Sequence, residues 1–484
     1  MSLRASESNA APHYVLSRSY PEAQGVSPAA IGAFLDAIES AGVELHSLMV
    51  LRHGNVVAEG WWYPYRAETP HLLYSLSKSF TSTAIGLAIA EGLLNLDAPV
   101  VSFFPDKLPP VVSDHLAAMT VRHLLTMSTG QEESDRTTLS WDEDSDWVRD
   151  FLAQPVTAAP GSRFRYSSIA TFMCSAIVHR VSGEDLLDYL MPRLFTPLGI
   201  ERPVWHRSPD GTSVGGWGLS LTTESIAKFG QLYLQRGLWN GTQLVPQDWI
   251  SQATSKQISN EEGGELDWRL GYGFQFWQCQ HGAYRGDGAF GQFCVVCPEQ
   301  DLVVAMTSSA NNMQVILTAL WEKVLSGLDD KPVSTENSSL IERLATLQLP
   351  GPRGDSSSAV DFLGRIFRAD TSSPVQGAWT VRKIDKVLEL VFQSETEQLA
   401  YHAGLEGWIF SEAKLGGEGP GPVAGKAAWS DRATLLVEFH DVASPFRVNW
   451  EFDFDGEALR VKTRYNGRFG EPEGAEFSGR IQSQ

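Results

Sequence analysis

The chain has 484 residues, which exceeds one ordinary domain, so two or three folding units are expected. Its composition, 43% hydrophobic and 20% charged, is that of a globular protein with a substantial core. The formal net charge of −20 argues against nucleic acid or an anionic membrane surface as a partner.

The N-terminus and the cysteines predict a cytoplasmic protein. The first eight residues contain no apolar core of the secretory kind, and no apolar run has the length of a membrane span. Four cysteines are too few to stabilise a chain of this size through disulfide bonds. Cys294 and Cys297 have CxxC spacing, but they lie in a predicted strand, where residues three apart face opposite sides. We therefore expect reduced, buried thiols rather than a redox or metal site.

The first predicted elements are a helix, a hairpin and a second helix. Ser27 and Pro28 cap a helix that runs to Ala41. Ser47–Arg52 and Val56–Trp62 are β-rich and are joined by His-Gly-Asn, which is typical of a hairpin. Residues 75–94 predict a helix that is apolar on most sides and therefore buried.

The middle of the chain is predicted to be helical. Helices are expected over Thr120–Met127, from Ser168 to about Val181, over Glu184–Leu194 and over Thr222–Gln235. Acidic residues gather in one loop, namely Glu132, Glu133, Asp135, Asp142, Glu143, Asp144 and Asp146. We interpret this segment as a solvated acidic loop, and the alternative is a lid that attracts a cationic substrate.

Strands return in the last part of the first 330 residues. They are expected over Gly273–Gln278, Gly291–Cys297 and Leu302–Ser308, with a helix over Met313–Leu325. Strands at both ends with helices between them predict an α+β domain over residues 1–330. This domain is an antiparallel sheet flanked by helices, with a helical insertion over roughly residues 95–240.

The remainder predicts a separate domain. Residues 331–358 are rich in Pro, Gly, Ser and charge, which favours a linker with one short helix near 339–347. Residues 359–484 predict an antiparallel all-β domain. Its clearest strands lie in Arg447–Arg464, where apolar and polar residues alternate around a turn at Asp455-Gly456.

A serine and a lysine stand three apart at the start of the buried helix. At this spacing Ser75 and Lys78 share one helix face. The hydroxyl would meet the positive end of the helix, and burial would disfavour the charged ammonium, so Lys78 is a candidate base for a nucleophilic Ser75. Ser-x-x-Lys alone is weak, since Ser225/Lys228 and Ser411/Lys414 have the same spacing. Only Ser75 precedes a helix that is apolar nearly all round.

A tyrosine provides a second candidate group. Tyr166 follows the strand-like Phe164-Arg165 and precedes Ser167-Ser168, which open a helix. A phenol in this position could hydrogen-bond both the nucleophile and the amine and then protonate a leaving group. A lone tyrosine is more often structural, so this reading depends on Ser75.

A glycine-rich segment provides the third candidate. Gly286, Gly288 and Gly291 fit GxGxxG, but a strand follows them where a nucleotide site needs a helix. Glycines that enter a strand instead let a substrate carbonyl approach the backbone. The N–H groups of Ala289 and Ser75 are the expected oxyanion hole.

These pieces, in this order, resemble the serine β-lactamase/penicillin-binding-protein superfamily, in its class C-like branch of β-lactamases, esterases, D-amino-acid peptidases and 6-aminohexanoate-oligomer hydrolases. The likeness covers roughly residues 20–325. Its blocks are Tyr74–Phe80, Glu91–Val100, Val121–Gly130, Pro160–Tyr166, Pro197–Ile200, Gly215–Ser220 and the glycine strand. The resemblance implies that Ser75 is the nucleophile, Lys78 the base and Tyr166 the proton shuttle.

Two positions depart from the family pattern. The Tyr-x-Asn motif reads Tyr166-Ser167-Ser168, so Ser168 stands in place of an amide that touches the substrate. The Lys-Thr-Gly or His-x-Gly box reads Gly286-Asp287-Gly288, so its cation is missing. In β-lactamases that cation helps to hold the substrate carboxylate. Arg285 is the nearest replacement, but on a strand its side chain is expected on the opposite face.

Other candidates carry less weight. Trp217 is a candidate wall of the substrate cleft, and core packing is at least as good a reading in a chain with 15 tryptophans. The histidines show no HExxH or similar spacing, so neither a metal nor a cofactor is expected. His123 is interpreted as a packed residue.

The sequence therefore predicts a serine hydrolase that cleaves an ester or amide bond of a small molecule through an acyl-enzyme on Ser75. The missing signal and the missing cation favour an esterase or amide-oligomer hydrolase. The first alternative is a true β-lactamase or D-peptidase. The second is a non-catalytic ligand-binding or sensor module in which the C-terminal domain is the partner surface. The oligomeric state is left open.

Overall fold

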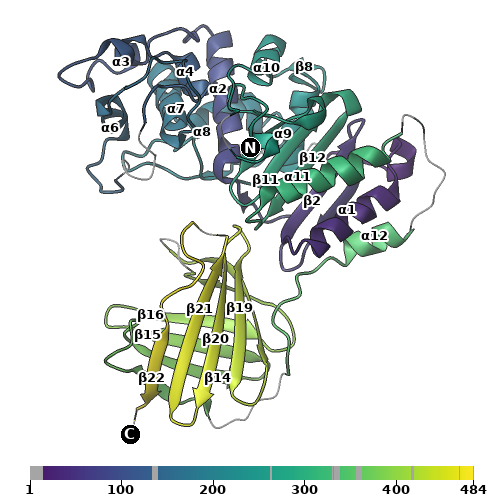
Figure 1. Cartoon of the computed structure of the whole chain (residues 1–484). Coiled ribbons are helices and arrows are strands. Elements are labelled where there is room, and N and C mark those ends of the chain that lie inside the picture. The colour runs from purple at the N-terminus through teal and green to yellow at the C-terminus, as the bar shows by residue number, and fades with distance from the viewer. Residues whose placement is uncertain are drawn as a thin grey trace, which may run out of the picture.

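A computed structural model describes residues 15–132, 140–261, 264–329, 331, 338–355, 362–415, 419–467 and 469–482. These residues form two parts, one above the other in Figure 1. The first combines helices with a sheet and ends with α12 (Ser338–Ala345). The second is a β-barrel that begins with β13 (Ile366–Ala369). The mixed fold and the separate all-β domain confirm the predicted fold class.

A seven-stranded sheet organises the first part. Its order is β1-β3-β2-β12-β11-β10-β9, and every pairing is antiparallel except that of β1 with β3. The strands are β1 (Ser17–Arg18), β2 (Leu45–Arg52), β3 (Asn55–Trp61), β9 (Trp277–Gln278), β10 (Tyr284–Gly288), β11 (Gln292–Cys297) and β12 (Leu302–Ser308). Strands from the two ends of this part therefore meet in the middle of the sheet, as predicted.

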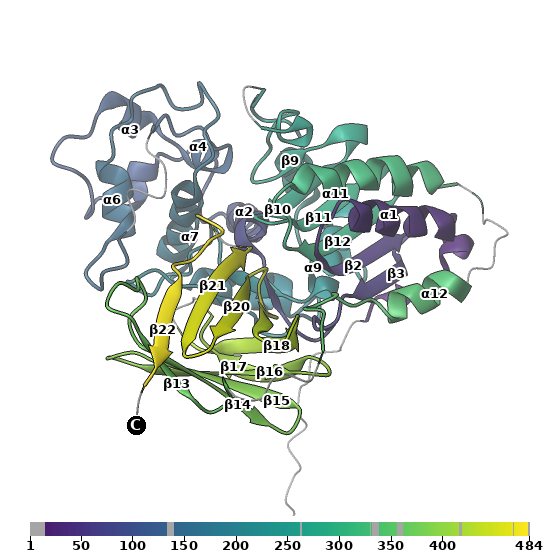
Figure 2. The same ribbon diagram turned by 60° about the horizontal axis from the view of Figure 1, so that its bottom comes forward.

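Helices cover both faces of the sheet. α1 (Pro28–Ser40), α11 (Met313–Ala319) and α12 pack on one face, and α9 (Thr223–Leu234) packs on the other (Figures 1 and 2). Alternate strand residues enter the two cores, since Cys294 lies with the α9 side and Cys297 with the α1 side. All four cysteines are buried and unbridged.

A helical region is inserted between α2 (Ser77–Ala90) and α9. It contains α3 (Asp114–Ala118), α4 (Val121–Leu125), α6 (Trp147–Ala153), α7 (Ser168–Ser182) and α8 (Leu186–Leu190). The short elements β4 (His71–Leu72), β5 (Val204–Trp205), β6 (Leu219–Leu221), β7 (Leu238–Trp239), β8 (Thr242–Gln243) and α10 (Gln247–Ala253) complete the first part. α2 lies between the sheet and this region, and its residues 77–88 are all buried.

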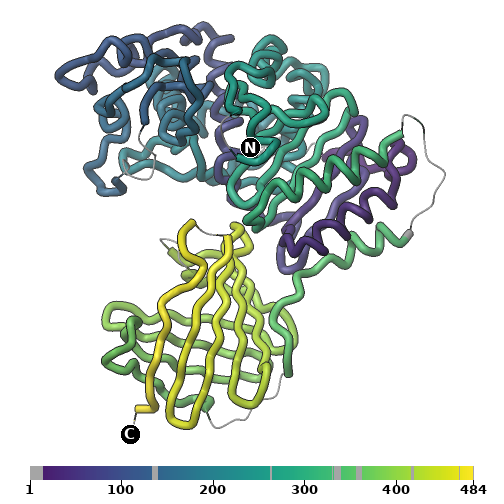
Figure 3. Tube along the Cα trace, viewed as in Figure 1, coloured from purple at the N-terminus to yellow at the C-terminus, as the bar shows by residue number. Residues whose placement is uncertain are grey.

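The second part is a ten-stranded barrel. Its strands are β13, β14 (Ala378–Ile384), β15 (Val387–Gln393), β16 (Gln398–Gly404), β17 (Ile409–Ala413), β18 (Gly421–Trp429), β19 (Thr434–Asp441), β20 (Arg447–Asp455), β21 (Ala458–Asn466) and β22 (Phe477–Ile481). A pairing of β16 with β18 closes the sheet. Aromatic side chains, among them Trp379, Tyr401, Trp450 and Phe452, fill its interior. β22 ends at the tip of the barrel that points away from the first part (Figure 3).

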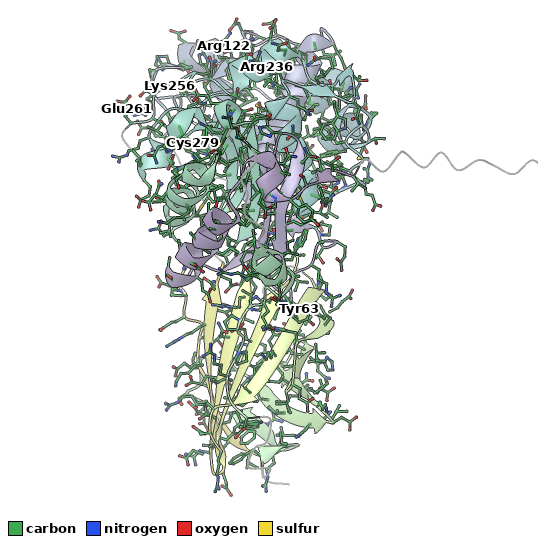
Figure 4. The ribbon with its side chains drawn as sticks, turned by 90° about the vertical axis from the view of Figure 1, so that its right-hand side faces the viewer. Tyr63, Arg122, Arg236, Lys256, Glu261 and Cys279 are labelled. Atoms are coloured by element: carbon green, nitrogen blue, oxygen red, sulfur yellow. The ribbon has the colours of Figure 1, made fainter. Side chains whose placement is uncertain are left out.

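The opposite tip of the barrel contacts the first part. The backbone N–H of Leu72 donates to the carbonyl of Ala443 at 2.7 Å, and the Asn466 amide donates to the Ser309 hydroxyl at 2.9 Å. Tyr63, labelled at the junction in Figure 4, meets Phe410 edge-on at a ring separation of 6.0 Å.

A buried polar cluster crosses the same junction. His46 lies 3.1 Å from both His71 and Glu44, and Glu44 forms an ion pair with Arg447 of the barrel. The hydroxyl of Tyr65 lies 3.3 Å from His440. The contacts of Glu44 with Arg447 and of Tyr65 with His440 join residues more than 370 positions apart, so nothing in the local sequence indicated them.

Three predicted elements are corrected. The buried helix begins at Ser77, because a 3-10 turn, η2 (Tyr74–Leu76), precedes it. Residues 164–166 do not form a strand. The N–H of Arg165 donates to the carbonyl of Met127 at 2.7 Å, outside any strand pairing. The strand predicted over Gly273–Gln278 is reduced to β9, because Gln275 adopts a φ of 67° and interrupts it.

The acidic loop is described in part. Glu133 and Asp135 lie outside the described residues. Glu132 pairs with Arg163 at 2.7 Å, and Asp146 caps α6 by accepting from the N–H of Arg149 at 3.1 Å. These two acids have structural partners, which agrees with the reading of a solvated loop.

Candidate active site

Ser75 lies in a tight turn where the chain enters α2. It is the central residue of η2, and Tyr74 before it has a φ of 47°, a strained value for a residue with a side chain. Ser77 ties the turn, since its hydroxyl donates to the carbonyl of Tyr74 at 2.6 Å and accepts from the N–H of Leu219 at 3.1 Å. Ser75 is half-buried, so the surrounding structure holds its hydroxyl without sealing it in the core.

Lys78 is placed directly against Ser75. Its side chain is buried, with 1% of the residue exposed. The amine Nζ lies 3.0 Å from the Ser75 Oγ, 3.0 Å from the Ser168 Oγ and 2.6 Å from the carbonyl oxygen of Gly216. The predicted pairing of hydroxyl and amine is therefore present, and Ser168 is brought to the same amine.

Tyr166 lies close to the same amine. The Nζ of Lys78 is 4.9 Å from the centre of the phenol ring. The ring stacks on the indole of Trp277 at 5.5 Å with an interplanar angle of 18°, and it meets Tyr272 edge-on at 6.3 Å. Ser75, Lys78 and Tyr166, predicted from separate parts of the sequence, thus converge on one place.

The glycine strand β10 packs directly against the turn that contains Ser75. A Cβ atom built on Gly288 would fall 1.9 Å from the carbonyl oxygen of Leu73 and 3.2 Å from the backbone nitrogen of Ser75. Only glycine allows this approach. Ala289 follows Gly288 in the turn that leads to β11.

Gly286 also faces α2, where a larger residue would press against two side chains. A Cβ there would lie 2.5 Å from both the Cδ1 of Leu76 and the Oγ of Ser79. Arg285 is buried on the opposite face, as predicted, and its Nε donates to the Oδ2 of Asp287 at 2.9 Å. Burial raises the pKa of the Asp287 carboxyl above its usual range, although Arg285 acts in the opposite direction.

The ring of Trp217 packs against other tryptophans, whereas the preceding residue, Gly216, contacts Lys78. The carbonyl of Gly216 accepts from Lys78, whereas the Trp217 indole packs at 5.9 Å from Trp147 and 6.5 Å from Trp141. Trp217 is partly buried, and Trp141 is half exposed. The packing role of Trp217 is therefore seen directly.

Two aromatic residues flank the expected oxyanion hole, and the barrel adds a third. Tyr74 precedes Ser75, and Phe290 follows Ala289, with 5.5 Å between the two rings. Phe469, from the β21–β22 connection, lies 6.0 Å from Tyr74 and 5.1 Å from Phe290. The barrel therefore reaches the edge of the candidate site.

The two other Ser-x-x-Lys spacings are used differently. Lys228 lies 3.6 Å from the carboxylate of Glu224, and Lys414 lies 3.4 Å from that of Glu397. Neither arrangement resembles that of Lys78, which lies within 3.0 Å of three neutral oxygens.

The histidines have structural partners. His123 caps α4, because its Nδ1 accepts from the N–H of Thr120 at 3.0 Å. His46 and His71 belong to the buried cluster at the barrel junction. Among the residues that the structure describes, no three His, Cys, Asp or Glu side chains are arranged to hold a metal ion.

Sequence reasoning missed three parts of the site. The Gly216 carbonyl binds Lys78, but a backbone acceptor has no sequence signature. Trp277 stacks on Tyr166, although more than a hundred residues separate the two in the sequence. Asp287 was noted only as the middle of the altered box, and the alternation of β10 could have placed it beside Arg285 on one face.

The comparisons with known proteins agree with this geometry. The model of the family described as Beta-lactamase matches residues 33–328, which is more than half of the chain. The chain therefore belongs to the Beta-lactamase family, and the resemblance to the serine β-lactamase/penicillin-binding-protein superfamily is confirmed.

Its relatives in this family are hydrolases. The chain is 24% identical to a 6-aminohexanoate-dimer hydrolase of Paenarthrobacter ureafaciens, over 58% of this chain and 76% of that protein. It is 28% identical to the esterase EstB of Burkholderia gladioli, over 37% of this chain and 53% of that protein. The crystal structure of a family VIII carboxylesterase shares the fold with a TM-score of 0.51 at 16% identity, covering 64% of this chain and 99% of that one.

No helix in the described part of the chain combines the length and the apolar character needed to cross a membrane.

Proposed function

We propose that this protein is a serine hydrolase that cleaves an ester or amide bond through an acyl-enzyme on Ser75. The observation that carries the proposal is the buried Lys78 amine, 3.0 Å from the Ser75 hydroxyl. A serine is a weak nucleophile until a base removes its proton, and this contact supplies the base.

The partners of Lys78 fit a neutral amine. A neutral amine has two N–H groups and one lone pair. The Gly216 carbonyl can only accept, and the Ser168 hydroxyl can accept as well, so together they take both N–H groups. The lone pair of the amine can then accept the proton of Ser75, whose Oγ lies 3.0 Å away. Burial disfavours the ammonium form, which supports the same assignment.

The oxyanion and the leaving group need separate partners. The tetrahedral intermediate places negative charge on the former carbonyl oxygen, and the N–H groups of Ser75 and Ala289 are the proposed donors. Tyr166, beside the same amine, is the proposed donor of a proton to the leaving group. Water then attacks the acyl-enzyme. In this step Tyr166 takes the proton of the water and Lys78 returns its proton to Ser75.

Neutral esters and amides fit the site better than penicillins do. Position 286 is a glycine, and a side chain there would have to displace the Leu76 and Ser79 side chains. The group that holds a β-lactam carboxylate in related enzymes is therefore absent from this position. The names of the esterase and 6-aminohexanoate-dimer hydrolase relatives support the same choice.

Turnover of p-nitrophenyl acetate tests the proposal. Ser75→Ala is expected to lower kcat/KM by at least about 1,000-fold, as removal of a catalytic nucleophile does elsewhere. Ser411→Ala is the matched control, because Ser411 has the same spacing to a lysine but lies in the barrel strand β17. Equal activity in wild type and Ser75→Ala would show that the nucleophile lies elsewhere. Saturable binding without any turnover would favour the sensor alternative.

A further inference from the structure

A buried side-chain amide is bonded to the turn that carries the proposed oxyanion donor Ala289. Gln292 is the first residue of β11 and is 0% exposed. Its amide nitrogen donates to the carbonyl of Ala289 at 2.9 Å and to the carbonyl of Ser308 at 2.8 Å. Its amide oxygen accepts from the N–H of Ser308 at 3.2 Å. Both N–H groups and the oxygen of this amide are therefore bonded to backbone.

The turn from Gly288 to Gly291 has a strained conformation. The N–H of Gly291 donates to the carbonyl of Gly288 at 3.1 Å, which closes a β-turn. Phe290, the third residue, has a φ of 67°, whereas Ala289 before it does not have a positive φ. This combination defines a type II turn, in which the third residue is usually glycine. A phenylalanine persists there only when the surrounding structure holds it.

The hydrogen bonds to the turn select this conformation. Type I and type II turns differ in the direction of the central peptide, whose carbonyl here is that of Ala289. Gln292 holds that carbonyl, so it opposes the reversal of the peptide that would relax Phe290. The hydroxyl of Ser308 adds a contact to the Phe290 carbonyl at 2.6 Å. Since β10, β11 and β12 are neighbours in the sheet, these bonds join the strand ends around the turn (Figure 2).

The same turn contacts the nucleophile turn that contains Ser75 on both sides of Ala289. A Cβ on Gly288 would lie 3.2 Å from the backbone nitrogen of Ser75, and the ring of Phe290 lies 5.5 Å from that of Tyr74. The Ala289 N–H shares a planar peptide with the Gly288 carbonyl, and in a trans peptide the two point in opposite directions. Because that carbonyl is bonded within the turn, the N–H is directed out of it.

We propose that Gln292 is a positioning residue for the oxyanion hole, because its amide holds the turn in the conformation that aims the Ala289 N–H at the substrate oxygen. This inference rests on the proposed function. Gln292 acts through the Ala289 carbonyl rather than on the substrate itself. An oxyanion hole stabilises the transition state only if its donors already lie about 2.7–3.1 Å from the charged oxygen, so a loosened turn should lower kcat more than it raises KM.

Two esters that differ in one atom test the inference. The negative charge develops on oxygen in p-nitrophenyl acetate and on sulfur, a weak hydrogen-bond acceptor, in p-nitrophenyl thionoacetate. An intact oxyanion hole therefore favours the oxygen ester in kcat/KM, and a displaced donor reduces that preference. Each rate is corrected for spontaneous hydrolysis.

Gln292→Met retains the length of the side chain and removes its hydrogen bonds. We expect kcat for p-nitrophenyl acetate to fall by about 10- to 100-fold with little change in KM, since complete loss of one donor costs about 100- to 1,000-fold. The ratio of kcat/KM between the oxygen and thiono esters is expected to fall by about tenfold. The ratio is independent of how much active protein each preparation contains, so a general loss of structure does not imitate the result.

Gln131→Met is the matched control. Gln131 is also buried, and its amide donates to the carbonyl of Phe151 at 2.9 Å in the helical region. The replacement removes a bond of the same kind, so it is expected to lower Tm and to leave the ratio of the two esters unchanged.

The outcomes are distinguishable. If Gln292→Met fails to fold, Ser308→Ala, which removes a single oxygen atom from the contact with the turn, must shift the ratio in the same direction. An unchanged ratio in the folded variants, or a wild type that does not prefer the oxygen ester, overturns the inference and leaves the proposed function standing. If wild type hydrolyses neither ester in a Ser75-dependent way, the proposed function is contradicted and the inference falls with it.

Discussion

Replacing Gly288 by alanine tests whether the contact between β10 and the nucleophile turn is required for activity. The added Cβ would lie 1.9 Å from the Leu73 carbonyl oxygen, whereas ordinary contacts begin at 3.4 Å. The Leu73 oxygen belongs to the backbone and a Cβ is fixed directly to the backbone, so the strand or the turn must move by roughly 1.5 Å to restore normal packing. Gly288 does not have a positive φ, so the effect comes from contact alone.

The displacement affects stability and activity separately. Overpacking of this kind costs about 1–3 kcal/mol of the free energy of unfolding. A shift of about 1 Å between reacting groups lowers kcat by roughly 100-fold. We therefore expect Gly288→Ala to fold, with a modestly lower Tm, and to lose nearly all turnover of p-nitrophenyl acetate.

Gly32→Ala is the control for this experiment. Gly32 lies within α1, and nothing is found within 4 Å of an added Cβ. Alanine should stabilise that helix by about 1 kcal/mol and leave kcat unchanged. Activity of Gly288→Ala close to that of wild type would refute the claim that β10 and the Ser75 turn form one catalytic unit.

Two further predictions concern the junction with the barrel. Burial lowers the pKa of His46 to about 4, and the pKa of Glu44 falls to about 2 because His46, His440 and Arg447 outweigh its burial. Both groups bind protons more readily when unfolded, so stability is complete above pH 6.5 and should fall between pH 6.5 and 4, by up to about 3 kcal/mol for His46 alone; a Tm that stays constant over this range would contradict the assignment. Phe469→Ala is expected to lower kcat/KM for p-nitrophenyl esters with long acyl chains more than for the acetate, because it removes apolar surface beside Phe290, and Phe410→Ala, elsewhere on the barrel, should not. Equal effects on all chain lengths would show that Phe469 does not border the acyl site.

The candidate groups of the site could be selected from the sequence because each has a recognisable local pattern. Ser75 and Lys78 are three apart before an apolar helix, and the glycines of β10 stand at alternate positions of a strand. Their proximity in space followed from the order of the family blocks. We propose that the predicted domain limits, 1–330 and 359–484 around a linker, describe the organisation of the chain.

What the sequence could not predict depends on contacts between distant segments. The carbonyl of Gly216 carries no side chain, so its bond to Lys78 is invisible before folding. The cluster of His46, His71 and His440 joins two parts of the chain and follows no spacing rule. The start of α2 was misplaced because the strained φ of Tyr74 depends on tertiary packing around the turn.

The most direct test of the account is to locate the acyl group. The protein is mixed with p-nitrophenyl acetate, quenched in acid during turnover and digested, and the peptides are analysed by mass spectrometry. The account predicts one acetyl group on the peptide that contains Ser75, and none on that peptide in Ser75→Ala. An acetyl group on another residue during turnover, or turnover with no covalent intermediate on Ser75 under any quench, would contradict it.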